Sequence, residues 1–108
     1  MLKTLIIYRT KDNKEPFTEW LYSLDDKVLR TRIEARLARV EQGNFGEHKY
    51  FNGIIELRFD FGKGYRVYCA EDGEILVLLL TGGDKSRQSN DINKAIKYLE
   101  DYYEQKKI

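Results

Sequence analysis

Several residue types that commonly carry protein chemistry are scarce in this sequence of 108 residues, which contains one cysteine, one histidine and one proline. One cysteine cannot form an internal disulfide, and one histidine without a second such ligand does not make the usual zinc-binding sets. A single histidine also leaves no Ser-His-Asp arrangement to recognise. We therefore expect neither a metal nor a cofactor.

Long apolar runs and a strong net charge are also missing. No apolar segment approaches the roughly 18 residues of a membrane span, and the charged start and apolar stretch of a signal peptide are absent. We therefore expect a cytoplasmic protein without a membrane partner. Lysine and arginine number 19 against 18 acidic residues, a formal net charge of +1. Affinity for nucleic acid must then come from local clusters of positive charge.

The apolar content of 42% suffices for one modest core, and the patterns predict a single domain over residues 1–108. We expect a strand at 3–9, a helix from Pro16, a helix from Asp25 or Asp26 to about Gln42, strands at 54–61, 65–71 and 74–81, and a last helix capped by Ser89 or Asn90. Residues 43–53 are interpreted as a loop. The order β-α-α-β-β-β-α predicts an α+β fold, with helices covering one face of a largely antiparallel sheet.

The two predicted hairpins assign side chains to faces of the sheet. A three-residue loop at 62–64 pairs Phe61 with Tyr65 and Asp60 with Arg66. One face then carries Leu57, Phe59, Phe61, Tyr65, Val67 and Cys69, and the other carries Glu56, Arg58, Asp60, Arg66 and Tyr68. On the apolar face the thiol of Cys69 is expected to be buried and unreactive.

The second hairpin is predicted from the Asp72-Gly73 pair, a strong two-residue turn signal. This turn pairs Ala70 with Ile75. It places Leu76, Leu78 and Leu80 on the apolar face, and Ile75, Val77 and Leu79 on the arginine face. The third strand is therefore apolar on both faces, as expected of a strand inside a sheet.

The segments ELRF, GYRVY and GGDKSRQSNDINKA, in this order and spacing, resemble the phage-type addiction-module killer proteins, relatives of the RelE and HigB toxins. The resemblance spans nearly the whole chain, because GNFGEHKYFNG fits the entry into the first hairpin strand. It implies a RelE-like fold and the toxin of a type II toxin–antitoxin system, an endoribonuclease that cleaves mRNA on the ribosome. The implied partners are the ribosome, mRNA and a helix-turn-helix antitoxin, through which alone operator DNA would be bound.

Carried over residue by residue, the resemblance implies that Arg58 and Arg66 contact the scissile phosphate. Lys85 matches the lysine after the last strand, Lys49 the basic residue before the first hairpin strand, and Gln88 lies in the same element as Lys85. Such a site suits attack by the 2′-OH of the RNA, because arginine forks match phosphate oxygens and stay charged. The choice of general acid and base stays open among His48, Lys49, Lys85 and Tyr68.

A second basic feature lies on the predicted second helix, where Arg32, Arg36 and Arg39 share one flank. The stripe is a candidate track for an RNA backbone, where neutralised phosphates release counterions. It is also compatible with an ordinary solvated face paired with Glu34 and Glu41.

Other functions are compatible with the same residues. Arg58 and Arg66 could form a ladder of cross-strand ion pairs with Glu56 and Asp60. The domain could then be a non-catalytic module that binds an antitoxin and tunes repression. A third alternative keeps the scaffold but directs it to another RNA or translation component.

Overall fold

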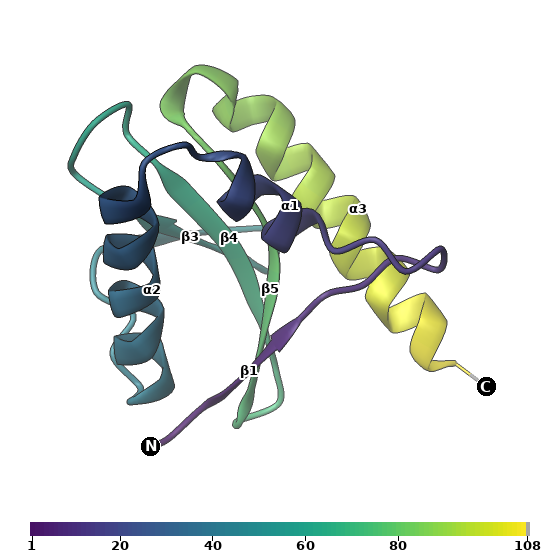
Figure 1. Ribbon diagram of the computed structural model, residues 1–108. Coiled ribbons are helices and arrows are strands. Elements are labelled where there is room, and N and C mark those ends of the chain that lie inside the picture. Colours follow the sequence, from purple (N-terminus) through teal and green to yellow (C-terminus); the bar gives the residue numbers. More distant parts are fainter. Residues whose placement is uncertain (108) are drawn as a thin grey trace.

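The computed structural model describes residues 1–107 as three α-helices and five strands (Figure 1). The elements are β1 (Thr4–Ile7), α1 (Pro16–Ser23), α2 (Lys27–Glu41), β2 (His48–Phe51), β3 (Ile54–Arg58), β4 (Arg66–Asp72), β5 (Leu76–Gly83), the 3-10 turn η1 (Lys85–Arg87) and α3 (Gln88–Lys106).

The strands form one sheet in the order β1-β5-β4-β3-β2. Only β1 is parallel to its neighbour, so the predicted α+β class with a largely antiparallel sheet is confirmed. The prediction of a loop over 43–53 is wrong, because β2 lies within it. Asn52 and Gly53 adopt φ values of 49° and 85°, a tight turn that pairs Phe51 with Ile54.

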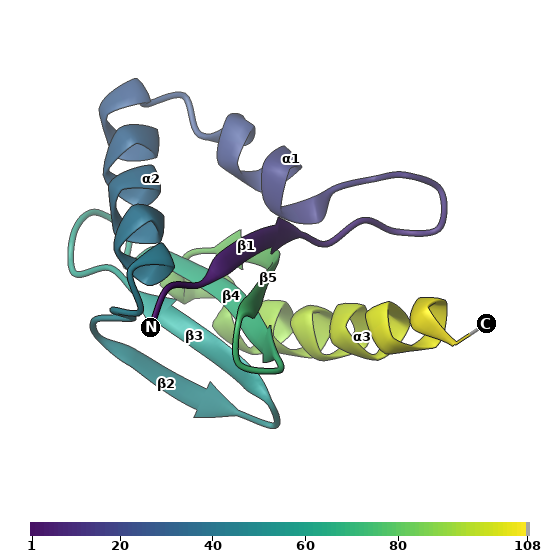
Figure 2. The ribbon, with the colours of Figure 1, turned by 90° about the horizontal axis from the view of Figure 1, so that it is seen from below.

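The helices lie on both faces of the sheet, with α1 and α2 on one side and α3 on the other (Figure 2). The expectation that helices cover one face is therefore wrong. The physical reason is that β4 and β5 are inner strands with apolar side chains on both faces, and each face must be removed from water.

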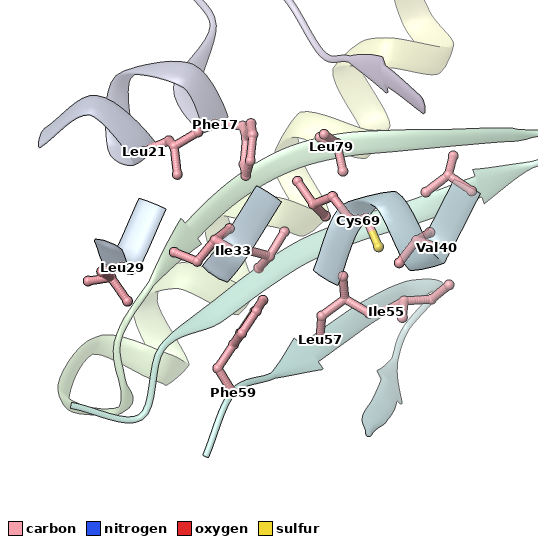
Figure 3. Packing of buried hydrophobic residues seen from close by; sticks show 13 residues of the cluster. Phe17, Leu21, Leu29, Ile33, Val40, Ile55, Leu57, Phe59, Cys69 and Leu79 are labelled. Atoms are coloured by element: carbon pink, nitrogen blue, oxygen red, sulfur yellow. The ribbon is translucent and has the colours of Figure 1, made fainter. Parts of the chain in front are cut away.

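The core beneath α1 and α2 is built from apolar side chains of these two helices and of the sheet face that they cover (Figure 3). Its buried members are Phe17, Leu21, Leu29, Ile33, Leu37, Val40, Ile55, Leu57, Phe59, Val67, Cys69, Val77 and Leu79. Cys69 is fully buried, as predicted, and burial raises the pKa of its thiol to about 12. The thiol therefore stays protonated at neutral pH. A second cluster beneath α3 contains Tyr8, Ile54, Tyr68, Ala70, Leu78, Leu80 and Ala95.

The register between β3 and β4 differs from the prediction by two residues. Arg58, rather than Asp60, is paired with Arg66, and residues 59–65 connect the strands. Phe59 and Phe61 in this connection lie under the guanidinium groups of Arg36 and Arg32, at 4.9 and 4.2 Å from the ring centres. Because the shift is even, the predicted division of side chains between the two faces is kept.

The register between β4 and β5 is shifted by an odd number of residues, so the predicted faces of β5 are wrong. Ala70 pairs with Leu78, not Ile75, because three residues (73–75) form the turn. Val77 and Leu79 consequently face α1 and α2, while Leu78 and Leu80 face α3. An irregularity opposite Tyr68 and Cys69 shifts the register again towards the end of β5.

The helix starts follow local chemistry. Pro16 occupies the first turn of α1, and the carboxylate of Asp26 caps α2 by accepting from the N–H groups of Val28 and Leu29. The expected cap of the last helix at Ser89 or Asn90 is wrong. Asp84 instead caps η1, which leads directly into α3. Over residues 1–107, no helix has the length and apolar character needed to cross a membrane.

Candidate functional site

The functional side chains gather around one buried carboxylate, that of Glu56 on β3. Glu56 is 0% exposed. It lies on the α3 face, between Lys49 of β2 and Tyr68 of β4 in the register of the sheet. A charged group at this depth is stable only with close donors, because burial removes its hydration.

Three side chains donate hydrogen bonds to this carboxylate. Arg58 Nε donates to Oε1 at 2.7 Å, while Gln88 Nε2 and the hydroxyl of Tyr68 donate to Oε2 at 2.8 and 3.1 Å. The Nε of Arg66 lies 3.8 Å from Oε2, an ion pair too long for a hydrogen bond. We call Glu56, its three donors and Arg66 the Glu56 cluster.

Charges in the Glu56 cluster do not cancel. One carboxylate faces two guanidinium groups, whose side chains are 23% (Arg58) and 10% (Arg66) exposed. Glu56 therefore fixes the position of two cations while leaving an excess of positive charge. The Nε of Arg66 is buried without a hydrogen-bond partner among the described residues. An arginine held in this way can receive an anion without first being ordered.

The loop between β3 and β4 brings Lys85 to the same place. The N–H of Lys85 donates to the carbonyl of Lys63 at 3.3 Å, and Arg66 Nη1 donates to the carbonyl of Gly64 at 3.0 Å. A Cβ at Gly64 would lie 3.2 Å from Lys85 Cβ and 3.5 Å from Arg66 Nη1. Gly64, at φ 71°, thus lets the two cationic side chains flank one loop.

Tyr68 and Gln88 are the two uncharged side chains that donate hydrogen bonds to the Glu56 carboxylate. Tyr68 is fully buried, and desolvation, followed by the negative charge of Glu56, raises the pKa of its phenol far above the ordinary value. Its hydroxyl therefore remains a donor to Glu56 and does not reach the surface. Gln88 is partly exposed at the start of α3, with its amide directed to Glu56. Both residues position Glu56 in this structure.

The two basic residues of β2 lie on opposite faces. Lys49 pairs with Glu56 and is exposed on the side of the cluster. His48 pairs with Leu57, so its ring lies on the other face, where Nδ1 is 2.7 Å from the carbonyl of Gly46. The structure therefore brings together Arg58, Arg66, Lys85, Lys49, Tyr68 and Gln88, but not His48.

The arginines of α2 form no continuous track with this cluster. Arg36 is half-buried and donates to the carbonyl oxygens of Phe45, Glu47 and Arg58, at 2.6–3.3 Å. Burial lowers the pKa of its guanidinium below the usual value. Arg36 thus ties two loops to α2, whereas Arg32 covers Phe61 and Arg39 is exposed on the outer face.

Glu56 is the residue that sequence reasoning missed. Alternation places Glu56 on the correct face, but the predicted ladder makes it only one of several equivalent ion-pair partners. The available signal was a carboxylate two positions before Arg58, within a strand whose remaining residues, Ile54, Ile55 and Leu57, are apolar. Such a residue is costly to bury unless several donors form hydrogen bonds with it.

Within residues 1–107, no group of three or more His, Cys, Asp or Glu side chains is placed to hold a metal ion.

Comparison with known proteins gives one informative relative. The sequence matches no established family profile, and no solved structure matches it. An uncharacterized protein of Haemophilus influenzae is 49% identical over 80 residues, which cover 73% of this chain and 81% of that protein. Identity at this level over most of both chains implies a common fold. The chain therefore belongs to the same protein family as this Haemophilus influenzae protein.

Proposed function

We propose that this chain is the toxin of a type II toxin–antitoxin pair, a RelE-like endoribonuclease that cleaves ribosome-bound mRNA. The observation that carries the proposal is the Glu56 cluster, in which a buried carboxylate holds Arg58 and Arg66 with an excess of positive charge. Preorganised cations of this kind stabilise the charge that develops on a phosphate in the transition state. The sequence resemblance supplies the reaction and the neutralising antitoxin.

The reaction needs no group beyond side chains and the RNA itself. The 2′-oxygen forms a bond to phosphorus as it loses its proton, and the bond between phosphorus and the 5′-oxygen breaks. The leaving oxygen takes up a proton, which gives a 2′,3′-cyclic phosphate and a free 5′-hydroxyl. Arg58 and Arg66 neutralise the phosphorane, and Lys85, beside Arg66, protonates the leaving oxygen.

The geometry narrows the choice of proton acceptor. Tyr68 is buried with a raised pKa, and His48 lies on the opposite face. Glu56 already accepts three hydrogen bonds and is shielded from any substrate. Lys49 is the remaining basic side chain on the face of the Glu56 cluster, and its amine would take up the proton in the neutral form, with the ribosome orienting the 2′-OH towards it.

Inducible expression in bacteria tests the proposal, with primer extension on a translated mRNA and on an untranslated control. We expect growth arrest and cuts confined to translated frames. Lys85→Ala should reduce cleavage by about 10²–10⁴, the usual contribution of proton transfer by a positioned side chain. Lys97→Ala, an exposed lysine on α3, is the matched control and should cleave normally.

Lys85 is a sharper test than the arginines because its side chain is exposed and its loss leaves Glu56 paired. Cuts in both the translated and the untranslated mRNA would contradict dependence on the ribosome and would indicate that the enzyme cleaves free RNA. Neither arrest nor cuts, with folded protein present, would contradict it and favour a non-catalytic antitoxin-binding module. The pairing of both arginines with Glu56 is the observation on which that alternative rests.

A further inference from the structure

Three arginines of α2 line a surface pocket of about 250 Å³ against the loop that connects β3 and β4. Arg32, Arg36 and Arg39 come from the helix, and residues 59–61 come from the loop. Among the described residues that line the pocket, Asp60 is the only acidic one, so guanidinium groups outnumber carboxylates three to one. We call this site the arginine pocket.

The positive charge of the arginine pocket is not neutralised by ion pairs within residues 1–107. None of the ion pairs in this part of the chain includes one of the three arginines. Arg36 donates instead to three main-chain carbonyl oxygens, which carry no net charge. Burial, followed by the nearby charge of Arg39, lowers the pKa of Arg36, while Glu47 and Asp60 attract it only from beyond ion-pair distance. Uncompensated charge of this kind favours the binding of an anion.

Two of the guanidinium groups are held in place by the protein itself. Arg32 lies over the ring of Phe61 and Arg36 over that of Phe59, at 4.2 and 4.9 Å from the ring centres. Gly46, at φ 65°, leaves room for Arg36, because a Cβ there would lie 2.9 Å from Arg36 Nε. A guanidinium fixed in this way loses little freedom on binding, and its planar fork matches the oxygens of a phosphate.

Aromatic side chains continue from the arginine pocket along β2. The carbonyl oxygen of Phe45 accepts from Arg36, and the ring of Phe45 lies 5.8 Å from that of His48, which lies 5.3 Å from that of Tyr50. His48 and Tyr50 pair with residues of β3 that are buried beneath α2, so their rings lie on the same face of the sheet as the pocket. Tyr50 is 66% exposed. Exposed rings beside cations are the combination on which single-stranded nucleic acids bind.

The arginine pocket and the Glu56 cluster lie on opposite faces of the sheet at the same end of β3. Arg58 connects the two sites, because its side chain pairs with Glu56 while its carbonyl oxygen accepts from Arg36 at 2.6 Å. The loop of residues 59–65 begins at this point and contributes its first residues to the pocket. Its later residues contact Lys85. An RNA strand that crosses this loop therefore meets cations on both sides of it.

We propose that the arginine pocket binds a backbone phosphate of RNA, outside the bond that is cleaved. Arg32 and Arg39 contact the phosphate oxygens, and Arg36 adds its charge from the buried side of the pocket. The strand continues along β2, where a base stacks on Tyr50. The choice of RNA rests in part on the proposed function, since the pocket shares a loop with the site proposed for cleavage.

Fluorescence anisotropy with the full-length chain tests this proposal on RNA that cannot be cleaved. The probe is a short, labelled single strand with 2′-O-methyl riboses, which lacks the 2′-OH needed for attack. The double variant Arg32→Gln/Arg39→Gln should weaken binding about tenfold or more at low salt, because charged hydrogen bonds are lost. The slope of log K against log salt concentration should fall by about 0.7, the value for one phosphate contact in a single strand. Both side chains are exposed, so the substitutions spare the core.

Two further variants separate the pocket from general surface charge and test the aromatic contact. Lys27→Gln/Lys97→Gln removes two exposed lysines that do not line the pocket, and it should leave affinity and salt slope unchanged. Tyr50→Leu should weaken binding of the RNA about fivefold or more, since a stacked base is lost. An abasic strand of the same length should bind Tyr50→Leu and wild type equally, whereas the arginine variant should bind both strands weakly.

The possible outcomes distinguish this proposal from its alternatives. Equal losses in the lysine and arginine variants, or an unchanged salt slope in the arginine variant, would overturn it. Tighter binding of a glutamate-rich peptide than of RNA, lost in the arginine variant, would assign the pocket to an acidic polypeptide instead. Arginine-dependent RNA binding without mRNA cleavage in bacteria would support the pocket and contradict the endoribonuclease. Cleavage in bacteria together with RNA binding that does not depend on these arginines would do the reverse.

Discussion

Glu56 on β3 and Asp91 on α3 are carboxylates at 0% and 7% exposure on the same side of the sheet, yet their surroundings differ completely. Glu56 accepts hydrogen bonds from Arg58, Tyr68 and Gln88, and has Arg66 nearby. Asp91 Oδ2 has no partner in the described residues. A satisfied buried carboxylate organises the groups around it, whereas an unsatisfied one is costly to bury in its charged form.

The largest effect is expected from removing the satisfied carboxylate. Glu56→Ala leaves the guanidinium of Arg66 and its neighbours without their buried partner, so the free energy of unfolding should fall by about 3–5 kcal/mol. Urea denaturation measures this change. Glu74→Ala, in the exposed turn between β4 and β5, is the control and should be close to wild type. Equal stability of the two variants would mean that Glu56 does not hold the cluster.

The contact between Gly83 and Asp91 gives the next largest effect. Gly83→Ala places a methyl group 1.9 Å from the Oδ2 position, so a buried segment must move, at about 1–3 kcal/mol. All three atoms nearest to the added Cβ belong to Asp91. The same substitution in an Asp91→Ala background should therefore cost much less. A double-mutant cycle by urea denaturation measures this coupling, and additive effects would show that the contact is not the cause.

Sequence reasoning succeeded where one local pattern decided the structure. The stripe of Leu29, Ile33 and Leu37 predicted the buried side of α2, and alternation predicted which residues of β3 and β4 share a face. Sequence reasoning failed where the geometry of a turn determined which strands pair and in which register. Asn52-Gly53 is a strong short hairpin signal, but the polar, glycine-rich residues around it favour the interpretation of 43–53 as a loop, which hides β2.

The sequence predicts the two arginines of the candidate site, but it does not predict the side chains that hold them in place. Arg58 and Arg66 on one face followed from alternation, since an even shift of register preserves faces. Gln88 reaches Glu56 only because α3 packs on the face that was expected to be open. The burial of Asp91 depends on the contact between α3 and Gly83, which no local pattern specifies.

A smaller effect tests a single donor of the Glu56 cluster. Tyr68→Phe removes the hydroxyl that donates to Glu56 at 3.1 Å and keeps the buried ring, so unfolding should become easier by about 1–2 kcal/mol. Tyr102→Phe, which removes a bond to the nearly surface-exposed Asp72, should cost less. Thermal unfolding of both variants compares them. A larger loss for Tyr102→Phe would contradict the importance assigned to the buried network.

The smallest effect is expected at Asp91, and its sign is opposite to that at Glu56. Desolvation raises the pKa of Asp91 above its ordinary value of 3.8, so the folded state holds this proton more tightly than the unfolded state. The wild type therefore loses stability from this group as pH rises above about 3.8 through the folded pKa. Asp91→Asn has no such loss, and at pH 7 it should be as stable as wild type or slightly more stable. Urea denaturation at pH 4 and pH 7 measures the difference, which should grow with pH in favour of the variant. A variant that is less stable than wild type at pH 7 would show that Asp91 has a partner within the fold, and the contrast with Glu56 would then disappear.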